Sequence, residues 1–187
     1  GTLVAWATAA LAVTTSASGA EYTLTAQKDA AAQDLIYQHQ SVNAANAGAV
    51  AVEMGHAYSK LSFLATAGNG YTGAANLTQV QITGGIYATG TLNMVDGKVD
   101  PVGTATLTLA AGEKALVIPM AGQPTIAVTC TIDGKEFTAN IKADTMPSLL
   151  AGVEYEITLT VVGQEAVISS VKEVPWTTTK VDGGTIF

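Results

Sequence analysis

The sequence of 187 residues contains no arginine, and all eight of its basic residues are lysines. Proteins that read nucleic-acid grooves or bind phosphate tightly rely on the planar guanidinium group and on a basic face. Here fifteen acidic residues give the chain a formal net charge of -7 instead. The composition therefore disfavours nucleic acid, and we expect none among the partners of this protein.

Cysteine and histidine are scarce, which limits the chemistry that the chain can support. Cys130 is the only cysteine, so no internal disulfide can form, and no Cys/His cluster has the spacing of a zinc site. Cys130 falls on the apolar side of an expected strand, which favours a buried, inert thiol over a nucleophile. Neither His39 nor His56 has a catalytic partner beside it in sequence, and a structural His56 is favoured over a general base.

Motifs for cofactors and metals are also missing. The glycines form neither a dinucleotide-binding fingerprint nor a phosphate-binding loop. Asp96 and Asp100 flank a turn but supply too few oxygen ligands for a calcium loop. Glu154 and Glu156 share a strand face, where exposed polar positions explain them without catalysis. We therefore predict no catalytic, cofactor-binding or metal-binding residues and no enzymatic activity.

Charged residues make up only 12% of the chain and apolar residues 48%, which predicts a folded domain and excludes a disordered tail. The apolar stretch Leu3–Val13 looks like the core of a secretion signal, but no lysine precedes it, and we expect a mature chain. No other apolar run approaches the roughly 18 to 20 residues that a membrane-spanning helix needs.

From about Gly48 onward, apolar and polar side chains alternate with the period of a β-strand. The alternation has no fault between Val153 and Val161. Asp133-Gly134 between two alternating runs predicts a tight hairpin. The expected strands cover residues 50–54, 56–67, 77–83, 86–94, 104–109, 114–120, 126–132, 135–141, 153–161 and 166–174. Short antiparallel strands without a long helical pattern predict an all-β protein built as a two-sheet sandwich.

The first 47 residues differ, because they are alanine-rich and hold only weak elements. Leu3–Trp6 and Glu21–Ala26 are extended candidates, and Asp29 with the three alanines after it predicts a turn or two of helix. These elements are too few for a sandwich of their own. The segment either packs on the main domain or is the rest of a truncated one. We assign residues 1–47 to a partial N-terminal β domain plus linker and residues 48–187 to a C-terminal β-sandwich.

Several short segments, in order along the chain, resemble the fimbrillin-like family of Bacteroidales surface pilins, the type V pilus subunits. The family's middle signature is an apolar strand, then His-Ala, a small spacer and Lys-Leu-Ser-Phe, and it stands here at Val52–Phe63. The other matching segments are Gln33–Tyr37, Gly90–Asn93, Thr131–Lys135, Leu150–Val161 and Pro175–Trp176.

This resemblance implies transthyretin-like β-sandwich domains, export as an outer-membrane lipoprotein precursor, proteolytic trimming at the surface and polymerisation by strand exchange. The sequence departs from the family in two places. The first domain looks truncated before Asp34, and only eleven residues follow Trp176, which is short for the extension that stalk subunits donate. A tip, anchor or accessory position therefore stays open beside a stalk position.

The predicted function is that of a structural subunit of a cell-surface fimbria that supports adhesion. Its expected partners are other pilus subunits and a host or bacterial surface ligand, and it would meet a membrane only through the precursor's lipid anchor. An added strand can satisfy an open sheet edge, so apolar residues near the termini are the expected assembly residues. They are Leu3, Val4, Trp6, Val181, Ile186 and Phe187. The alternative is a surface binding module for a glycan or host protein, with Trp6 or Trp176 as contact.

Overall fold

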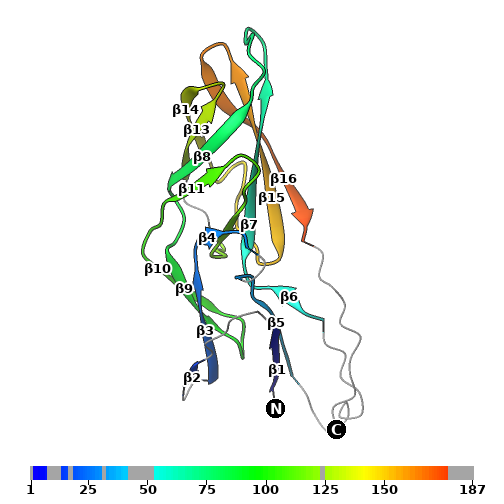
Figure 1. The fold of residues 1–187 in the computed structure, drawn as a ribbon. Coiled ribbons are helices and arrows are strands. Elements are labelled where there is room, and N and C mark those ends of the chain that lie inside the picture. Colours follow the sequence, from blue (N-terminus) through cyan, green and yellow to red (C-terminus); the bar gives the residue numbers. More distant parts are fainter. Residues whose placement is uncertain are drawn as a thin grey trace.

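The computed structural model describes residues 2–7, 14–16, 19–30, 33–41, 53–122 and 125–176, and every regular element among them is a β-strand (Figure 1). The strands are β1 (Thr2–Ala7), β2 (Thr14–Ser16), β3 (Gly19–Thr25), β4 (Gln27–Lys28), β5 (Ile36–Ser41), β6 (Gly55–His56), β7 (Ser59–Ala67), β8 (Leu77–Gly84), β9 (Thr89–Asn93), β10 (Val99–Val102), β11 (Leu107–Ala110), β12 (Ala115–Val117), β13 (Ile126–Ile132), β14 (Lys135–Ile141), β15 (Val153–Val162) and β16 (Glu165–Pro175). The all-β class predicted from alternation is confirmed. No helix in these ranges is long and apolar enough to cross a membrane.

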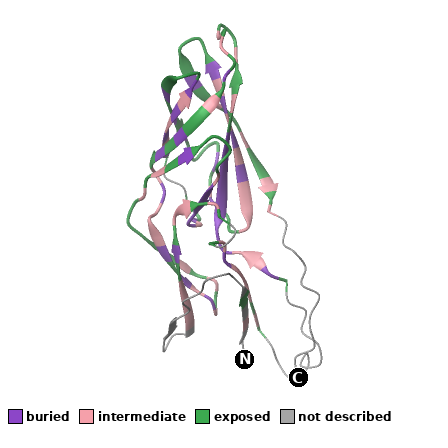
Figure 2. Ribbon diagram, in the orientation of Figure 1, coloured by how far each residue is buried: buried purple, intermediate pink, exposed green. Residues whose placement is uncertain are grey.

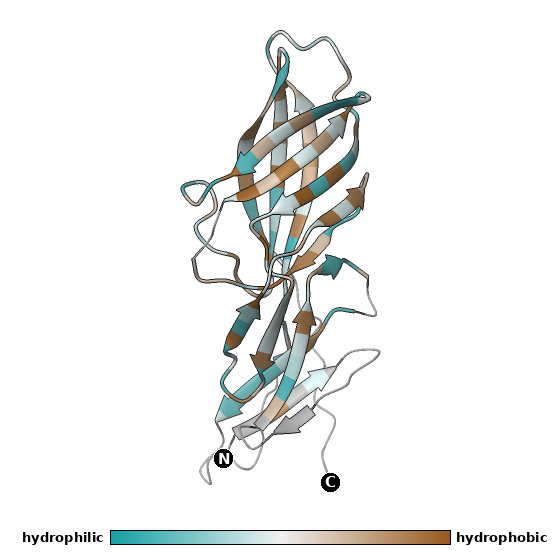
Figure 3. Ribbon diagram, turned by 90° about the vertical axis from the view of Figure 1, so that its left-hand side faces the viewer, coloured by the Kyte–Doolittle hydropathy of each residue, from teal (hydrophilic) through white to brown (hydrophobic). Residues whose placement is uncertain are grey.

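Two sheets form the upper sandwich of Figure 1. One has the strand order β11-β8-β13-β14 and the other β16-β15-β7-β12-β4. Alternate side chains of each strand point into the space between these sheets, as the buried positions of β13 and β15 show (Figures 2 and 3). Their shared core includes Leu61, Val128, Cys130, Tyr155 and Ile157, all at most 1% exposed.

The lower sandwich of Figure 1 is smaller and has a core of its own. It pairs the sheet β1-β5-β6 with the sheet β10-β9-β3-β2. The buried residues between these sheets include Leu24, Leu35, Leu92 and Met94. Tyr58, just before β7, belongs to the same core, so this short connection carries the chain from one sandwich to the other.

Strands from before and after residue 47 pair in three of the four sheets. β3 pairs with β9, β4 with β12, and β5 with β6. Backbone hydrogen bonds thus join the two sides of the boundary that the sequence suggests. The division of the chain into folding domains at residue 47 stays a prediction, as does the transthyretin-like topology.

The hairpin predicted at Asp133-Gly134 is confirmed, with φ of 50° and 75° at its two turn residues and full pairing of β13 with β14. The helix predicted after Asp29 is wrong for the residues that can be described there. Asp29 and Ala30 have no regular structure, and the Gln33 N–H donates to the Ala30 carbonyl to close a turn. Residues 31–32 lie outside the described ranges.

The expected antiparallel arrangement needs one correction, because β7 and β15 run parallel from Lys60 and Glu154 onward. Hairpin connections force antiparallel pairing, but these two strands are joined through the opposite sheet and can therefore run in the same direction. The other strand pairs are antiparallel among the residues described. The larger sheet of the upper sandwich is therefore mixed.

Candidate functional site

β7 leaves part of one edge without a strand partner. On one side β15 pairs with it as far as Ala67. On the other side β12, with only three residues, pairs with Ser59–Leu61 and no further. From Ser62 to Ala67, no strand of the described chain lies along this second edge. An unpaired edge of this kind presents backbone donors and acceptors to an incoming strand.

A cavity of about 590 Å³ lies against the same edge. Its lining comprises Phe63, Leu64, Ala65, Ala74, Ala75, Asn76, Leu77 and Gly112. Phe63 reaches into the upper core, whereas Leu64 points outward and is 50% exposed. A strand placed here could send alternate side chains toward the core and toward the outer face, which is the geometry of strand addition.

The assembly residues predicted from the sequence are placed only in part. Trp6 lies on β1 and is 45% exposed, and Val4 on the same strand is half-buried against the lower core. β1 forms the outer edge of its sheet within the described residues. Leu3 is a β1 residue whose side chain lies outside the described part. The three C-terminal positions also lie outside it: Val181, Ile186 and Phe187.

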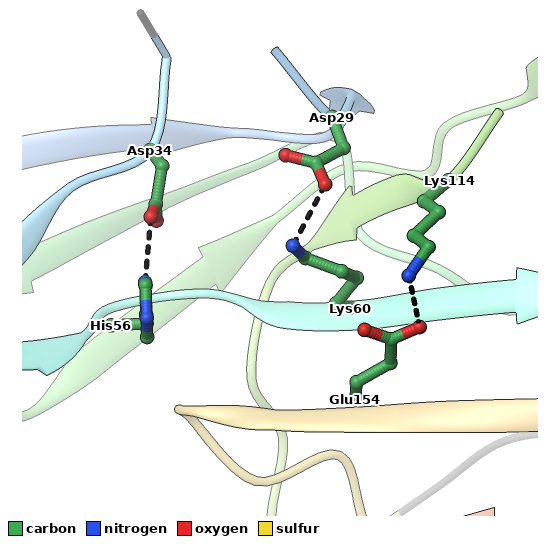
Figure 4. A network of polar contacts seen from close by, with 6 residues as sticks. All are labelled: Asp29, Asp34, His56, Lys60, Lys114 and Glu154. Atoms are coloured by element: carbon green, nitrogen blue, oxygen red, sulfur yellow. Dashed lines mark hydrogen bonds and ion pairs between the residues drawn. The ribbon is translucent and has the colours of Figure 1, made fainter. Parts of the chain in front are cut away.

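Five polar and aromatic residues meet between the two sandwiches: Asp29, Asp34, His56, Lys60 and Trp176, here called the junction cluster. His56 Nδ1 lies 2.6 Å from Asp34 Oδ2, and the His56 ring stacks on Trp176 at 3.7 Å with 9° between the planes. Lys60 Nζ lies 2.8 Å from Asp29 Oδ2 and 3.6 Å from the centroid of the Trp176 ring. Figure 4 shows the two ion pairs side by side.

The cluster draws on three separate parts of the chain. Asp29 and Asp34 follow β4 and precede β5, His56 and Lys60 flank the entry to β7, and Trp176 follows β16. The backbone N–H of Trp176 also donates to the Gly152 carbonyl at 3.2 Å. The cluster therefore ties the end of β16 and the start of β7 to the connection that leads into the lower sandwich.

Burial governs the electrostatics of the junction cluster. The side chains of His56 and Lys60 are each 10% exposed, and that of Asp34 is 15% exposed. Burial raises the pKa of Asp34 above its ordinary value, although the neighbouring His56 pulls it down. Because Trp176 covers the ring of His56 and the Nε2 atom is buried, a substrate has no access to this side chain, and the arrangement suits a structural histidine better than a general base.

Lys114 and Glu154 form a second ion pair beside the cluster, with 2.6 Å between Nζ and Oε1 (Figure 4). Burial acts to raise the pKa of Glu154, but the hydrogen bond and charge of Lys114 hold it below its ordinary value. Glu154 and Lys60 are register partners on β15 and β7. The start of β7 is therefore bordered by charges that are paired with one another.

The reactive groups of an enzyme do not converge in the part of the chain that is described. Burial raises the pKa of the Cys130 thiol to about 12, which leaves it protonated and inert. No three His, Cys, Asp or Glu side chains gather there in a metal-binding arrangement. Trp176, a candidate ligand contact in the sequence, stacks on His56, whereas Trp6 stays exposed.

Sequence reasoning missed the junction cluster because its members are far apart along the chain. Asp34 and His56 are 22 positions apart, so a search for a carboxylate beside the histidine could not find the pair. One signal was present. Asp34, His56, Lys60 and Trp176 all fall inside the segments that carry the family resemblance, and the fold brings these segments together.

Solved structures share this fold. A crystal structure of a protein from Bacteroides uniformis, described as a cell adhesion protein, is 24% identical with a TM-score of 0.67, and the match covers 84% of this chain and 66% of that one. A second such protein, from Bacteroides ovatus, is 15% identical with a TM-score of 0.56, covering 95% and 61%. The chain thus spans about two thirds or less of the length of both. A fimbrial protein from Bacteroides vulgatus is 11% identical over 94% of this chain and 68% of its own length, with a TM-score of 0.41 that is too low to bear on the fold.

No curated protein matches the sequence. The family model for fimbrillin-like proteins, however, matches residues 3–176, which is nearly the whole chain. The matched range includes β7 with its unpaired edge and all five residues of the junction cluster. The chain therefore belongs to the fimbrillin-like family.

Proposed function

We propose that this protein is a structural subunit of a cell-surface fimbria and that it joins its neighbours by strand exchange. In this proposal an extended segment of one subunit adds to β7 of the next, along Ser62–Ala67. The observation that supports it most directly is the unpaired edge of β7 with a cavity of about 590 Å³ beside it. The partners are other pilus subunits, and the site of action is the cell surface.

The free energy gained in such a contact can be compared with the entropy lost on association. Each new backbone hydrogen bond contributes about 1 kcal/mol net, and each buried Leu, Ile or Phe side chain about 1.5 to 3 kcal/mol. A strand that forms several backbone bonds and places two such side chains in the cavity therefore has about 6 to 10 kcal/mol to set against the entropy lost on association. The donor segment would carry apolar residues at alternate positions. Val4 and Trp6 on β1 have this spacing, whereas the other predicted assembly residues do not: Leu3, Val181, Ile186 and Phe187.

Family membership supports a fimbrial role, and the proposed export as a lipoprotein precursor through the outer membrane follows from the same resemblance. The junction cluster supports it from another direction. A fibre subunit must keep its two ends in a defined relation, and Trp176, which follows β16 of the upper sandwich, stacks on His56 of β6 in the lower one.

Hydrogen exchange measured by mass spectrometry would test the edge directly. We expect the backbone amides of Ser62–Ala67 to exchange more slowly in the polymer than in the isolated subunit, because strand addition bonds them. The amides of β13, which is already paired on both sides, serve as the internal control. Unchanged exchange at β7 in a polymer that has clearly formed would refute strand addition at this edge.

A pair of deletions tests the donor. Removal of residues 177–187, or of residues 1–7 with the edge strand β1, should reduce the ladder of high-mass polymer on a denaturing gel without unfolding the upper sandwich. Normal ladders from both deletions would exclude these segments as donors, while the exchange experiment still reports on the acceptor edge.

A further inference from the structure

Three connections between strands meet at the end of the upper sandwich that lies farthest from β1 (Figure 1). They are the loop between β7 and β8, the β13–β14 turn and the β15–β16 turn. Together they line a hollow of about 440 Å³, formed by Gly70, Tyr71, Thr72, Gly73, Asp133, Lys135, Gly163 and Gln164. A volume of this size falls in the range of small-ligand sites.

The hollow is held in shape by the Asp133 carboxylate. Its Oδ2 accepts the Tyr71 hydroxyl at 2.6 Å and the Ala75 N–H at 2.9 Å, and its Oδ1 accepts the Asn76 N–H at 2.9 Å. The Asp133 N–H in turn donates to the Asn76 carbonyl at 3.0 Å. Hydrogen bonds from Tyr71 and the loop backbone keep the pKa of Asp133 below its ordinary value, so this carboxylate is ionised at neutral pH. The loop is therefore organised before any ligand arrives.

Close packing at Gly73 fixes the Tyr71 ring as well. A Cβ atom at Gly73 would lie 2.3 Å from Asp133 Oδ2 and 2.6 Å from a carbon of the Tyr71 ring. Only glycine leaves room for this approach, and it places the peptide backbone directly against the tyrosine. The tyrosine is thereby held in one orientation at the wall of the hollow.

The remaining lining combines groups that recognise sugars. Thr72, Lys135 and Gln164 are exposed and supply a hydroxyl, an ammonium and an amide. The half-buried Tyr71 adds an aromatic surface, which suits the apolar face of a pyranose ring. The ammonium of Lys135 is balanced by ionised Asp133, so the hollow has no net charge. The chain's charge of -7 repels anions, which favours a neutral ligand.

We propose that this distal hollow binds a neutral saccharide of one or two rings. The site is separate from the β7 edge, so it adds adhesion to assembly and does not depend on strand exchange. In this proposal the distal hollow, and not Trp6 or Trp176, is the ligand contact of the protein. Thr72, Lys135 and Gln164 donate and accept hydrogen bonds with the sugar hydroxyls, and Tyr71 supports the ring.

The test uses the full chain, labelled with a fluorophore, on an array of immobilised saccharides of one to four rings. The array carries neutral hexoses and N-acetylhexosamines, with sialylated and sulfated saccharides beside them. We expect the wild-type chain to bind at least one of the neutral saccharides. The triple variant Thr72→Ala, Lys135→Ala and Gln164→Ala should lose that binding by tenfold or more. The matched control carries Gln81→Ala and Lys172→Ala, an exposed amide and an exposed lysine outside the hollow, and should bind as the wild type does.

Thermal unfolding of the triple variant should match the wild type, because all three side chains are exposed, and it should still polymerise. The proposal is overturned if the wild-type chain binds none of the neutral saccharides, or if the triple variant binds as tightly as the control. A preference for sialylated or sulfated saccharides over neutral ones would also overturn it. A failure of polymerisation would bear only on strand exchange.

Discussion

Replacing Lys60 with methionine should destabilise the protein by about 3 kcal/mol. The ammonium of Lys60 is held between Asp29 and the Trp176 ring, and its side chain is 10% exposed. Breaking a fully buried ion pair costs about 3 to 5 kcal/mol because the remaining charge is left without a partner. Asp29 is 22% exposed, so water recovers part of that cost, while the lost cation–π contact adds about 1 kcal/mol.

A double-mutant cycle shows whether the loss comes from the pair itself. Asp29→Asn alone should cost about 2 kcal/mol, and the double variant about 3 kcal/mol instead of the roughly 5 kcal/mol that independent effects would sum to. The coupling free energy is then about 2 kcal/mol. Urea unfolding followed by tryptophan fluorescence gives the free energies, and Trp176 lies within the cluster as a local reporter.

Lys98→Met is the matched control, because Lys98 and Asp100 also form a 2.8 Å ion pair but are 67% and 68% exposed. Water and salt screen this pair, so its loss should lie within the error of the measurement. If Lys60→Met were as mild as Lys98→Met, or if the cycle were additive, the Lys60–Asp29 pair would not stabilise the junction cluster.

Three further outcomes follow from other parts of the molecule. Cys130 should react with a thiol reagent such as dithionitrobenzoate only after unfolding, because burial raises its pKa to about 12. Gly85→Ala should lower the free energy of unfolding in urea by more than about 2 kcal/mol, because the new Cβ would lie 2.3 Å from the Thr125 carbonyl oxygen. At Gly134 a Cβ meets open space, so Gly134→Ala should cost only the roughly 1 kcal/mol that a positive φ imposes on alanine. The pKa of Asp133 is lower in the folded protein than its ordinary value of 3.8. The ionised carboxylate therefore stabilises the folded state fully above pH 3.8, and this contribution is lost as the pH falls through the folded-state pKa. Asp133→Asn should therefore remove that part of the acid-induced loss of stability.

Strands that form hairpins were predictable from sequence because the alternation of apolar and polar residues lies within each strand. In β15 every second side chain is buried between Tyr155 and Val161, as the alternation predicts. β10 was missed because Pro101 interrupts it, and the pattern rules treat proline as a break. The parallel pairing of β7 with β15 could not be predicted from the sequence, because no local pattern encodes which of two strands some ninety residues apart will pair, or in which register.

The open edge of β7 depends on where β12 begins, because the antiparallel register sets Ala115 opposite Leu61, and earlier residues would lie opposite Ser62 and beyond. The sequence predicts a strand over residues 114–120, but pairing covers only Ala115–Val117. Just before β12 the chain makes a turn, which the Glu113 N–H closes by donating to the Ala110 carbonyl. The position of this turn against β7 is decided by the tertiary fold, so the edge becomes visible only in three dimensions.

β7 connects the proposed assembly edge to the junction cluster within a single strand. Its second half carries the edge at Ser62–Ala67, and Lys60 near its start is bonded to Asp29. A pull on a strand added to that edge would be transmitted along the β7 backbone and, through Lys60, to the connection into the lower sandwich. β15 would carry part of the same force, because it pairs with β7 from Lys60 to Ala67. In the proposed fibre, the ion pair that stabilises the fold therefore lies where tension would pass from β7 to the connection that leads into the lower sandwich.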